Sequence, residues 1–431
     1  MKIVHIVPGS GNTFYCQNCL RDGSLVQNLR VQGHDVVIVP MYLPLFTDRP
    51  GVTGSSPVFY GAINVYLKES SALFRLLPRW MGRILDTRWL LEYAARKAGS
   101  TQARGLEAMT ISMLRGEEGH QAVELERLVE WLSVEGRPDV VHLSNAMLIG
   151  LARRIRQRLG CPVVCTMQDE DSWINSMEKD SAARIWQTMS ERAQDVDAFV
   201  AVSSYYRDRM KELARIPDRK LHIVHIGIDP AEYGLSTTPL DPPVIGFLSR
   251  LCPALGLDIL VDAFIQLKNE PRLSGAKLSL SGGAVGRDQA FVRQIRRTLA
   301  RHHMEDDLLV SPEFAHDTRL RFLQSLTVLS VPVPQGEAFG IYLLEAQASG
   351  VPVVQPDAGA FPEIIKKAGG GILYSPNNAA SLAAALKSLL LDPTRLKELA
   401  RKGRNGVAQH FTLERMAARM LQVYRGVSTA R

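Results

Sequence analysis

Short runs of valine and isoleucine alternate with longer helical patterns along most of the chain, and this alternation constrains the fold more than any other feature. It is typical of parallel β-strands joined by helices, with both faces of the sheet covered. The predicted strands are residues 3–7, 35–40, 140–144, 162–167, 198–202 and 221–226, then 244–248, 277–281, 308–310, 327–333, 351–355 and 371–374.

The length of the chain implies more than one domain, because 431 residues exceed the roughly 250–300 at which a single core stops growing. The strand pattern restarts after a turn-rich stretch near residue 240. We therefore predict an α/β protein of two doubly wound domains, 1–240 and 241–411, followed by a helical segment, 412–431. The segment from about 43 to 135 lacks the alternation, and we interpret it as a helical insertion in the first domain.

Composition and charge exclude several classes of protein. With 46% hydrophobic and 22% charged residues, the chain is not disordered, collagen-like or a coiled coil. A net charge of +7 without a dense basic run argues against a nucleic-acid partner. No apolar run reaches the roughly 20 residues that span a bilayer, and the first strand is too short for a signal peptide. We expect a cytoplasmic location.

One segment of the insertion, residues 73–97, is a candidate membrane contact. It has six basic and two acidic side chains, and Arg75, Arg79 and Arg83 recur every four residues among leucine and tryptophan. Such a helix either packs its apolar face on the protein or lies on the anionic inner surface of the membrane. A proline and a glycine within the segment weaken a continuous helix and favour the first interpretation.

The stretch 334–354 carries the most chemical information. A glycine-containing loop follows a strand, and a helix begins near Gly340 and ends at Gly350, with a proline two residues on. The N–H groups at such a helix start favour phosphate oxygens. Glu345, inside the helix, suits two ribose hydroxyls, and Glu337, in the loop, suits a sugar. We predict a nucleotide-sugar site in a cleft, where Glu345 contributes little to packing.

Glu337 and Glu345 form an E-x7-E motif, and together with the segments 350–354 and 359–363 this part of the chain closely resembles the retaining family 4 glycosyltransferases. The glycine loop 8–12 and the strand end 226–229 extend the resemblance to the N-terminal part. The resemblance implies two facing Rossmann-like domains of the GT-B type, with the donor on the second domain and the acceptor on the first. It also implies a last helix that crosses back to the first domain.

The resemblance further implies retaining transfer of a sugar from a nucleoside-diphosphate sugar to a hydroxyl acceptor, which is a saccharide, a lipid or a small molecule. It implies no catalytic metal and no other cofactor. Arg250 is expected to bind the pyrophosphate, with Gly340 and Ile341 offering backbone N–H groups. Glu345 is expected to bind the ribose and Glu337 the transferred sugar. The remaining donor-binding residues implied by the resemblance are Phe339, Gly11 and Asn12.

The chain departs from the family pattern at Leu255, where relatives have a lysine that neutralises the pyrophosphate. Leucine cannot stabilise charge on a departing nucleoside diphosphate. Either another cation replaces the lysine, or turnover is slow or absent. Arg287 is the nearest candidate by motif order, and the alternative is that it is an exposed arginine at a helix start. The alternative functions are a glycoside phosphorylase or nucleotide-sugar hydrolase on the same fold and, because of Leu255, a catalytically weakened nucleotide-sugar-binding protein.

A second departure is the acidic loop 168–171, where many relatives have a histidine. Loops at the carboxyl ends of parallel strands line the ligand crevice. We predict that Asp169 contacts the acceptor or the sugar, and the alternative is a solvated acidic turn or helix cap.

A zinc site on the cysteines is disfavoured. Cys161 and Cys165 lie roughly 13 Å apart along a strand, whereas sulfurs bound to one zinc ion lie roughly 4 Å from each other.

Overall fold

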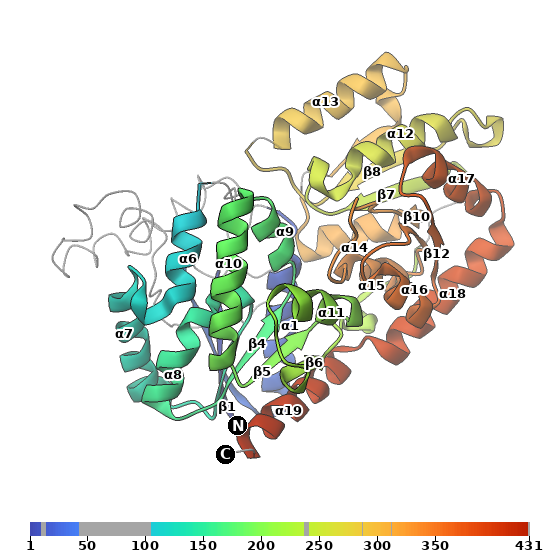
Figure 1. Ribbon diagram of the computed structural model, residues 1–431. Helices are drawn as coiled ribbons and strands as arrows, with labels where there is room; N and C mark the ends of the chain where they lie inside the picture. The colour runs from blue at the N-terminus through green and yellow to red at the C-terminus, as the bar shows by residue number, and fades with distance from the viewer. Residues whose placement is uncertain (10–13, 43–104, 237–240, 287, 312, 430–431) are drawn as a thin grey trace. The chain divides into compact units, whose positions relative to one another are not determined.

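The computed structural model describes residues 1–9, 14–42, 105–236, 241–286, 288–311 and 313–429 (Figure 1). They form two compact units. Unit 1 comprises the described residues of Met1–Asn12, Asn18–His225 and Met416–Arg431, and unit 2 those of Thr13–Gln17 and Ile226–Arg415. In these ranges no helix is both long and apolar enough to cross a membrane.

Unit 1 is built on a parallel six-stranded sheet in the order β2-β1-β3-β4-β5-β6. Its strands are β1 Lys2–Val7, β2 Asp35–Pro40, β3 Val140–Leu143, β4 Val163–Met167, β5 Ala198–Ala201 and β6 Leu221–Ile223. Nearly every residue of β1, β3, β4 and β5 is buried, as expected for strands covered on both faces.

Helices cover both faces of this sheet. They are α1 Gln17–Val31, α6 Glu107–Arg115, α7 Ala122–Trp131, α8 Ala152–Leu159, α9 Glu170–Asn175, α10 Lys179–Arg192, α11 Ser204–Leu213 and α19 Leu413–Thr429. Helix α6 packs on α10, and α7 on α8 (Figure 1). Helices α1 and α19 meet the sheet from the face that carries His5 and His142, because Asp22 of α1 and Tyr424 of α19 contact these histidines.

The predicted insertion lies mostly outside the described residues. Residues 43–104, which include the basic segment 73–97, are not described. The described end of the insertion forms α6 and α7, which agrees with the expected helices.

Unit 2 repeats the architecture, with a parallel sheet in the order β12-β11-β10-β7-β8-β9. Its strands are β7 Val244–Leu248, β8 Lys277–Ser281, β9 Leu308–Val310, β10 Val328–Leu329, β11 Val353–Pro356 and β12 Gly371–Tyr374. Its helices are α12 Leu257–Leu267, α13 Asp288–Arg301, α14 His316–Gln324, α15 Ile341–Ala348, α16 Phe361–Ala368, α17 Ala379–Leu390 and α18 Pro393–His410.

All the predicted strands are confirmed, and the differences lie at their ends. The largest is β10, which pairs only over Val328–Leu329 although residues 327–333 are all buried. Pro332 lacks the N–H group that a longer parallel ladder needs, so the segment stays buried without extending the strand.

The strand order of each sheet reverses at one point, between β1 and β3 in unit 1 and between β7 and β10 in unit 2. Right-handed crossovers then send the connections on either side of that point to opposite faces of the sheet. Ligands of doubly wound folds bind in the crevice that this leaves at the carboxyl ends of the strands. In unit 2 the loops after β7 and β10 flank this position.

Candidate functional site

The loop between β10 and α15 is held against the loop after β11 by two glycines. A Cβ on Gly336 would lie 2.5 Å from the backbone nitrogen of Gly359, and one on Gly359 would lie 2.7 Å from the backbone nitrogen of Glu337. Both glycines have positive φ, +71° and +60°. Only residues without a side chain fit, so the backbone beside Glu337 is fixed in place.

The start of α15 already has a hydrogen-bond acceptor in this structure. The N–H of Ile341 donates to the side-chain oxygen of Gln17 at 2.8 Å. The amide nitrogen of the same Gln17 donates to Glu337 Oε2 at 3.2 Å. Gly340, with φ +93°, forms the N-cap. Gln17 thus contacts two of the predicted donor-binding residues at once.

Glu345 is buried, with 1% of its surface exposed, so the expectation that this side chain contributes little to packing is wrong. Its Oε1 accepts hydrogen bonds from Arg319 Nε at 2.8 Å and the Tyr233 hydroxyl at 2.9 Å. Its Oε2 accepts from the Tyr15 hydroxyl at 2.5 Å. Burial and then the neighbouring Glu345 raise the pKa of both tyrosines well above the ordinary value, so both donate as neutral hydroxyls.

Arg250 lies after β7 and pairs with Asp288, the first residue of α13, at 2.6 Å. Its guanidinium carbon is 5.6 Å from the centre of the Phe14 ring, within cation–π range. Leu255 is half-buried in the 3₁₀ turn Pro253–Leu255. The predicted substitute Arg287, and the predicted donor residues Gly11 and Asn12, lie outside the described residues.

Phe339 has a fully buried side chain that packs edge to face on Phe411, with ring centres 6.1 Å apart. Its side chain therefore belongs to the core, and a ligand could reach only its backbone. Arg250, Glu337, Gly340, Ile341 and Glu345 all belong to unit 2. The first three lie in the loops at its switch point, and Ile341 begins α15.

The acidic loop of unit 1 divides into different environments. Asp169 is half-buried and has a left-handed backbone, with φ +64°, at the carboxyl end of β4. Glu170 is buried and accepts from the Ala146 N–H at 2.8 Å and the Tyr206 hydroxyl at 2.7 Å. Burial raises the pKa of Glu170 to about 7. Asp171 pairs with Arg209 at 3.0 Å. Asp169 is thus the member whose backbone conformation is unusual, as at many ligand sites.

A buried polar network beneath the same edge of unit 1 was not predicted. His5 Nδ1 lies 3.1 Å from His142 Nδ1, and the Tyr424 hydroxyl lies 2.7 Å from the same atom. His5 Nε2 is 3.2 Å from Asp22, which also accepts from Arg21 at 2.8 Å. Burial, then His5, holds the pKa of His142 well below its ordinary value. Burial alone would raise the pKa of Asp22, but Arg21 and His5 outweigh it and lower that pKa.

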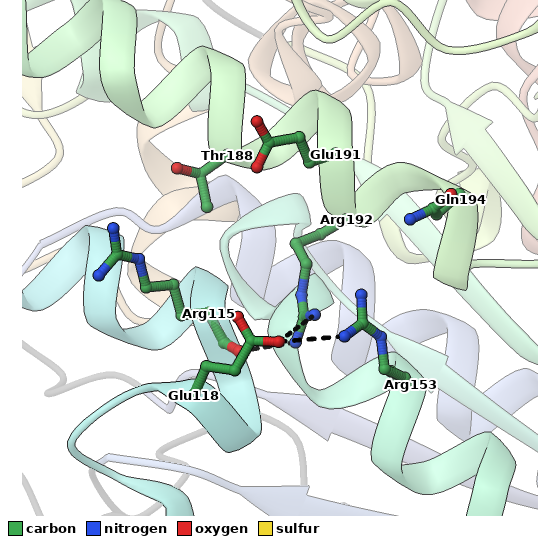
Figure 2. A pocket seen from close by; sticks show the side chains of 7 residues that line it. All are labelled: Arg115, Glu118, Arg153, Thr188, Glu191, Arg192 and Gln194. Carbon is green, nitrogen blue, oxygen red and sulfur yellow. Dashed lines mark hydrogen bonds and ion pairs between the residues drawn. The ribbon is translucent and has the colours of Figure 1, made fainter.

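A polar pocket of about 470 Å³ lies elsewhere in unit 1 (Figure 2). It is lined by Arg115, Glu118, Arg153, Thr188, Glu191, Arg192 and Gln194. Four of these residues come from the second half of α10 and the 3₁₀ turn Ala193–Asp195, which precede the amino end of β5. Ligands of parallel sheets bind at the opposite, carboxyl edge.

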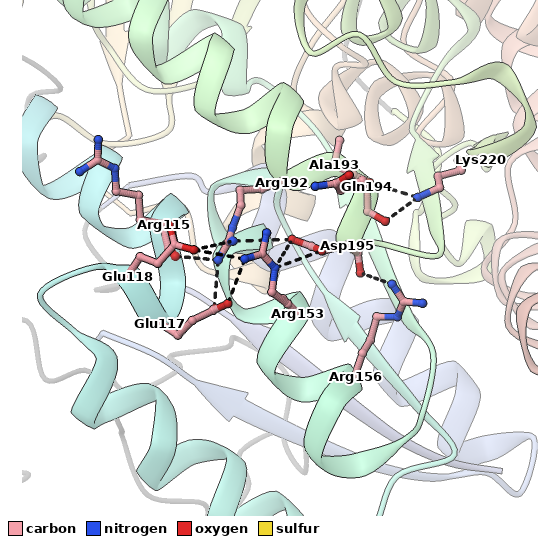
Figure 3. A network of polar contacts seen from close by, with 10 residues as sticks. All are labelled: Arg115, Glu117, Glu118, Arg153, Arg156, Arg192, Ala193, Gln194, Asp195 and Lys220. Carbon is pink, nitrogen blue, oxygen red and sulfur yellow. Dashed lines mark hydrogen bonds and ion pairs between the residues drawn. The ribbon is translucent and has the colours of Figure 1, made fainter.

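Arg153 and Arg192 of this pocket pair with acidic side chains (Figure 3). Arg153 contacts Glu117, Glu118 and Asp195 at 3.2–3.3 Å. Arg192 donates to the Arg115 carbonyl at 2.6 Å and to Glu117 at 3.0 Å. These bonds join the ends of α6, α8 and α10, so we interpret the cluster as a structural clamp.

Besides Gln17 and Asp288, the three residues that contact Glu345 were missed from the sequence: Tyr15, Tyr233 and Arg319. They contact Glu345 from 330, 112 and 26 residues away. No spacing or motif joins positions so far apart, and nothing in a single sequence distinguishes these side chains from other tyrosines and arginines.

Two protein-family models match consecutive parts of the chain. Residues 107–232 match the model of Glycosyltransferase Family 4, and residues 235–406 match that of Glycosyl transferases group 1. A D-inositol 3-phosphate glycosyltransferase of Catenulispora acidiphila is 27% identical over 315 residues, which cover 68% of this chain and 73% of that protein.

Two solved structures share the fold over nearly the whole chain. A sucrose-phosphate synthase from Thermosynechococcus elongatus aligns with a TM-score of 0.72 at 17% identity, covering 100% of both chains. The Anabaena protein HepE in complex with UDP-glucose aligns with a TM-score of 0.68 at 16% identity, covering 99% of both chains. Both support the expected pair of Rossmann-like domains.

Proposed function

The chain belongs to glycosyltransferase family 4, and on that premise we propose that it transfers a sugar from a nucleoside-diphosphate sugar to a hydroxyl acceptor, with retention and without a metal. Unit 2 binds the donor and unit 1 the acceptor. The protein supplies positioning and charge stabilisation, and the departing phosphate oxygen takes the acceptor proton.

One observation supports the donor site above the others. Arg250 follows β7, whereas Glu337 and the N–H group that begins α15 follow β10, so the two loops that flank the switch point of one sheet both contribute to the site. A guanidinium suits a pyrophosphate, a helix start suits a phosphate oxygen, and a half-buried carboxylate suits sugar hydroxyls. UDP-glucose is the ligand of the HepE structure, so UDP-sugars are the first donors to test.

The pairing of charges supports a second candidate, a nucleotide-sugar-binding protein with weak turnover. Arg250 is matched by Asp288, and Arg319 by Glu345. Leu255 adds no charge where relatives have a lysine. A pyrophosphate must therefore share Arg250 with Asp288, which lowers the positive potential that stabilises a leaving nucleoside diphosphate.

Thermal shifts with UDP-, GDP- and ADP-sugars identify the donor, because a ligand at 100 times its dissociation constant adds about 2.7 kcal/mol of stability. Release of nucleoside diphosphate is then measured with and without saccharide, lipid and small hydroxyl acceptors. Acceptor-dependent release supports the transferase. Release without acceptor indicates a hydrolase, and binding without release indicates the weakened binder.

Two substitutions test the role of charge. Arg250→Ala should lower turnover by about 10²–10³-fold, the usual effect of removing one group that stabilises a transition-state charge. Leu255→Lys should leave turnover unchanged or raise it. Arg395→Ala and Leu309→Lys, at exposed positions of unit 2, are the matched controls. Loss of activity in a folded Leu255→Lys protein contradicts the charge argument.

Asp169→Asn tests the acceptor side. Asparagine tolerates the left-handed backbone of this position, so the substitution removes the charge and keeps the fold. We expect a higher KM for the acceptor and an unchanged affinity for the nucleotide. Asp180→Asn, in the first turn of α10, is the control.

The insertion is proposed to recognise the acceptor, and contact with an anionic membrane is the alternative for its basic segment. Flotation with liposomes that contain or lack anionic lipid separates the two. Anion-dependent flotation that is lost when Arg75, Arg79 and Arg83 become glutamate supports the membrane role. Absence of flotation supports acceptor recognition alone.

A further inference from the structure

The segment 14–17 clusters with unit 2, although the chain on both sides of it belongs to unit 1. The Tyr15 N–H donates to the Gly282 carbonyl at 2.9 Å, which fixes the segment beside the loop after β8. Three of its four side chains contact residues of the proposed donor site. Phe14 lies over Arg250, Tyr15 donates to Glu345, and Gln17 bonds both Glu337 and Ile341.

These contacts reproduce the chemistry of a nucleotide-sugar. The side-chain oxygen of Gln17 accepts a hydrogen bond from the Ile341 N–H, which a phosphate oxygen of the donor would otherwise accept. The Gln17 amide N–H donates to Glu337 as a sugar hydroxyl would. The Tyr15 hydroxyl donates to Glu345 as a ribose hydroxyl would. A peptide segment thus satisfies the same hydrogen-bonding groups as the proposed donor.

Burial makes the two occupants mutually exclusive at one position. Glu345 is 1% exposed and Tyr15 is 4% exposed, and their oxygens are 2.5 Å apart. A ribose hydroxyl cannot come within hydrogen-bond distance of Glu345 Oε2 while the Tyr15 ring covers it. The same holds for the Ile341 N–H, a single donor whose acceptor is Gln17.

We propose that residues 14–17 act as a pseudo-donor strap, which occupies the nucleotide-sugar site of unit 2 and must be displaced before the donor binds. The proposal rests on the proposed function of that site. The apparent dissociation constant for the nucleotide is then the intrinsic one divided by the fraction of molecules with the strap displaced. Substitutions that weaken the strap should therefore tighten nucleotide binding.

The sign of this effect is the test. UDP, GDP and ADP are each titrated by calorimetry into the full-length wild type, Gln17→Ala and Tyr15→Phe. For whichever nucleotide binds, we expect tighter binding to both variants, by about tenfold if nine molecules in ten hold the strap closed. Gln17 is half-buried and Tyr15→Phe keeps the ring, so both variants should fold.

Two control variants match the substitutions. Gln32→Ala removes an exposed glutamine just after the other end of α1, where its side chain donates to Asn28 of that helix. Tyr206→Phe removes an equivalent tyrosine–glutamate bond from unit 1. Both should bind the nucleotide as the wild type does.

Weaker binding by Gln17→Ala and Tyr15→Phe overturns the strap, because the two side chains then act as ligands of the donor. Unchanged binding also overturns it, while the proposed function stands. Binding of no nucleotide by the wild type or either variant overturns the proposed function and the strap with it. Binding by the variants alone supports both.

Cys16 gives a second readout, since it lies within the strap and is half-buried. Its alkylation by iodoacetamide, followed by peptide mass spectrometry, should become faster when the nucleotide displaces the strap. Slower alkylation in the presence of the nucleotide means that the ligand covers a strap still in place, which contradicts the proposal.

Discussion

Glu345 of unit 2 and Glu170 of unit 1 are each 1% exposed and both accept tyrosine hydroxyls, two at Glu345 and one at Glu170, but they differ in the charge of their other hydrogen-bond donors. Glu345 has a guanidinium at 2.8 Å, from Arg319. The hydrogen-bond donors to Glu170 are neutral, the Ala146 N–H and Tyr206, and burial raises the pKa of Glu170 to about 7. Equal burial thus gives an ion pair in one unit and a carboxyl that titrates near neutrality in the other.

The difference has opposite consequences for substitution. A buried ion pair is costly to break from one side, because the remaining charge loses its partner while it stays out of water. A buried carboxyl without a cation is costly only when ionised, so replacing it with a neutral group removes that cost. The predictions below test this contrast, beginning with the largest expected effect.

Breaking the ion pair of unit 2 should have the largest effect. Arg319→Met and Glu345→Gln should each destabilise unit 2 by about 3–5 kcal/mol, and the double variant should recover most of this loss. Hydrogen exchange of peptides from α15 is the measurement, because the tryptophans of the described chain, Trp131, Trp173 and Trp186, all lie in unit 1.

The exposed pair Lys402–Glu398 provides the control for that cycle, since both side chains are 51% exposed. Lys402→Met should leave exchange in α15 unchanged. If the effects of Arg319→Met and Glu345→Gln simply add in the double variant, the two side chains are not coupled, and Glu345 is not stabilised by the arginine.

Titration of Glu170 should make unit 1 less stable as the pH rises. Its folded pKa of about 7 lies above the ordinary 4.5, so the folded protein keeps a proton that the unfolded chain has lost. The stabilisation is complete below pH 4.5 and is lost as the pH passes 7. At about 1.4 kcal/mol per pKa unit, wild type should lose about 2–3 kcal/mol relative to Glu170→Gln between pH 5 and 8.

Urea unfolding followed by the fluorescence of Trp173, which lies in α9 with Glu170, measures this difference. His142 contributes a pH dependence of opposite sign, but it is common to both proteins and cancels. Glu178→Gln, at an exposed position of unit 1, should follow the wild-type profile. Parallel profiles for wild type and Glu170→Gln would show that Glu170 stays ionised when buried.

Removing one hydroxyl from each cluster should give a smaller contrast. Tyr233→Phe removes a hydrogen bond to the carboxylate that pairs with Arg319 and should cost about 1.5–3 kcal/mol at pH 8. Tyr206→Phe should cost about 1 kcal/mol at pH 6, where Glu170 is mostly neutral, and more at pH 8. Equal costs for Tyr206→Phe at both values would contradict a titrating Glu170.

The sequence was sufficient for features set by neighbouring residues. The strands are continuous apolar runs, and the end of α15 is set by Gly350, whose φ of +71° places it just past the helix. The N–H groups of Gly350 and Val351 donate to Gln347 and Ala346, as expected for a glycine that ends a helix. Such signals lie within a few residues of each other.

Long-range contacts could not be predicted in this way. The E-x7-E spacing located Glu345 on its helix but gave no indication of its burial, because the groups that cover it are Tyr15 and Tyr233, 330 and 112 residues away. The same limit applies to the His5–His142 pair, whose members are 137 residues apart.

The smallest effect is expected for an ion pair with good geometry and no burial. Arg154 of α8 binds Glu126 of α7 through two nitrogens, one of them at 2.9 Å, and the side chains are 28% and 47% exposed. The hydrogen bond from Arg154 lowers the pKa of Glu126, so any stabilisation is present above the ordinary pKa and is lost as the pH falls through the lowered value. Water and salt screen both charges, and two long side chains must be ordered to form the pair.

Glu126→Gln should therefore leave the urea midpoint of unit 1 unchanged at pH 7. We expect this both at low salt and in 0.5 M salt, where the screening length is about 4 Å. A loss as large as that of Tyr206→Phe would mean that bidentate geometry stabilises without burial, and the contrast between Glu345 and Glu170 would then need an explanation other than their shared removal from water.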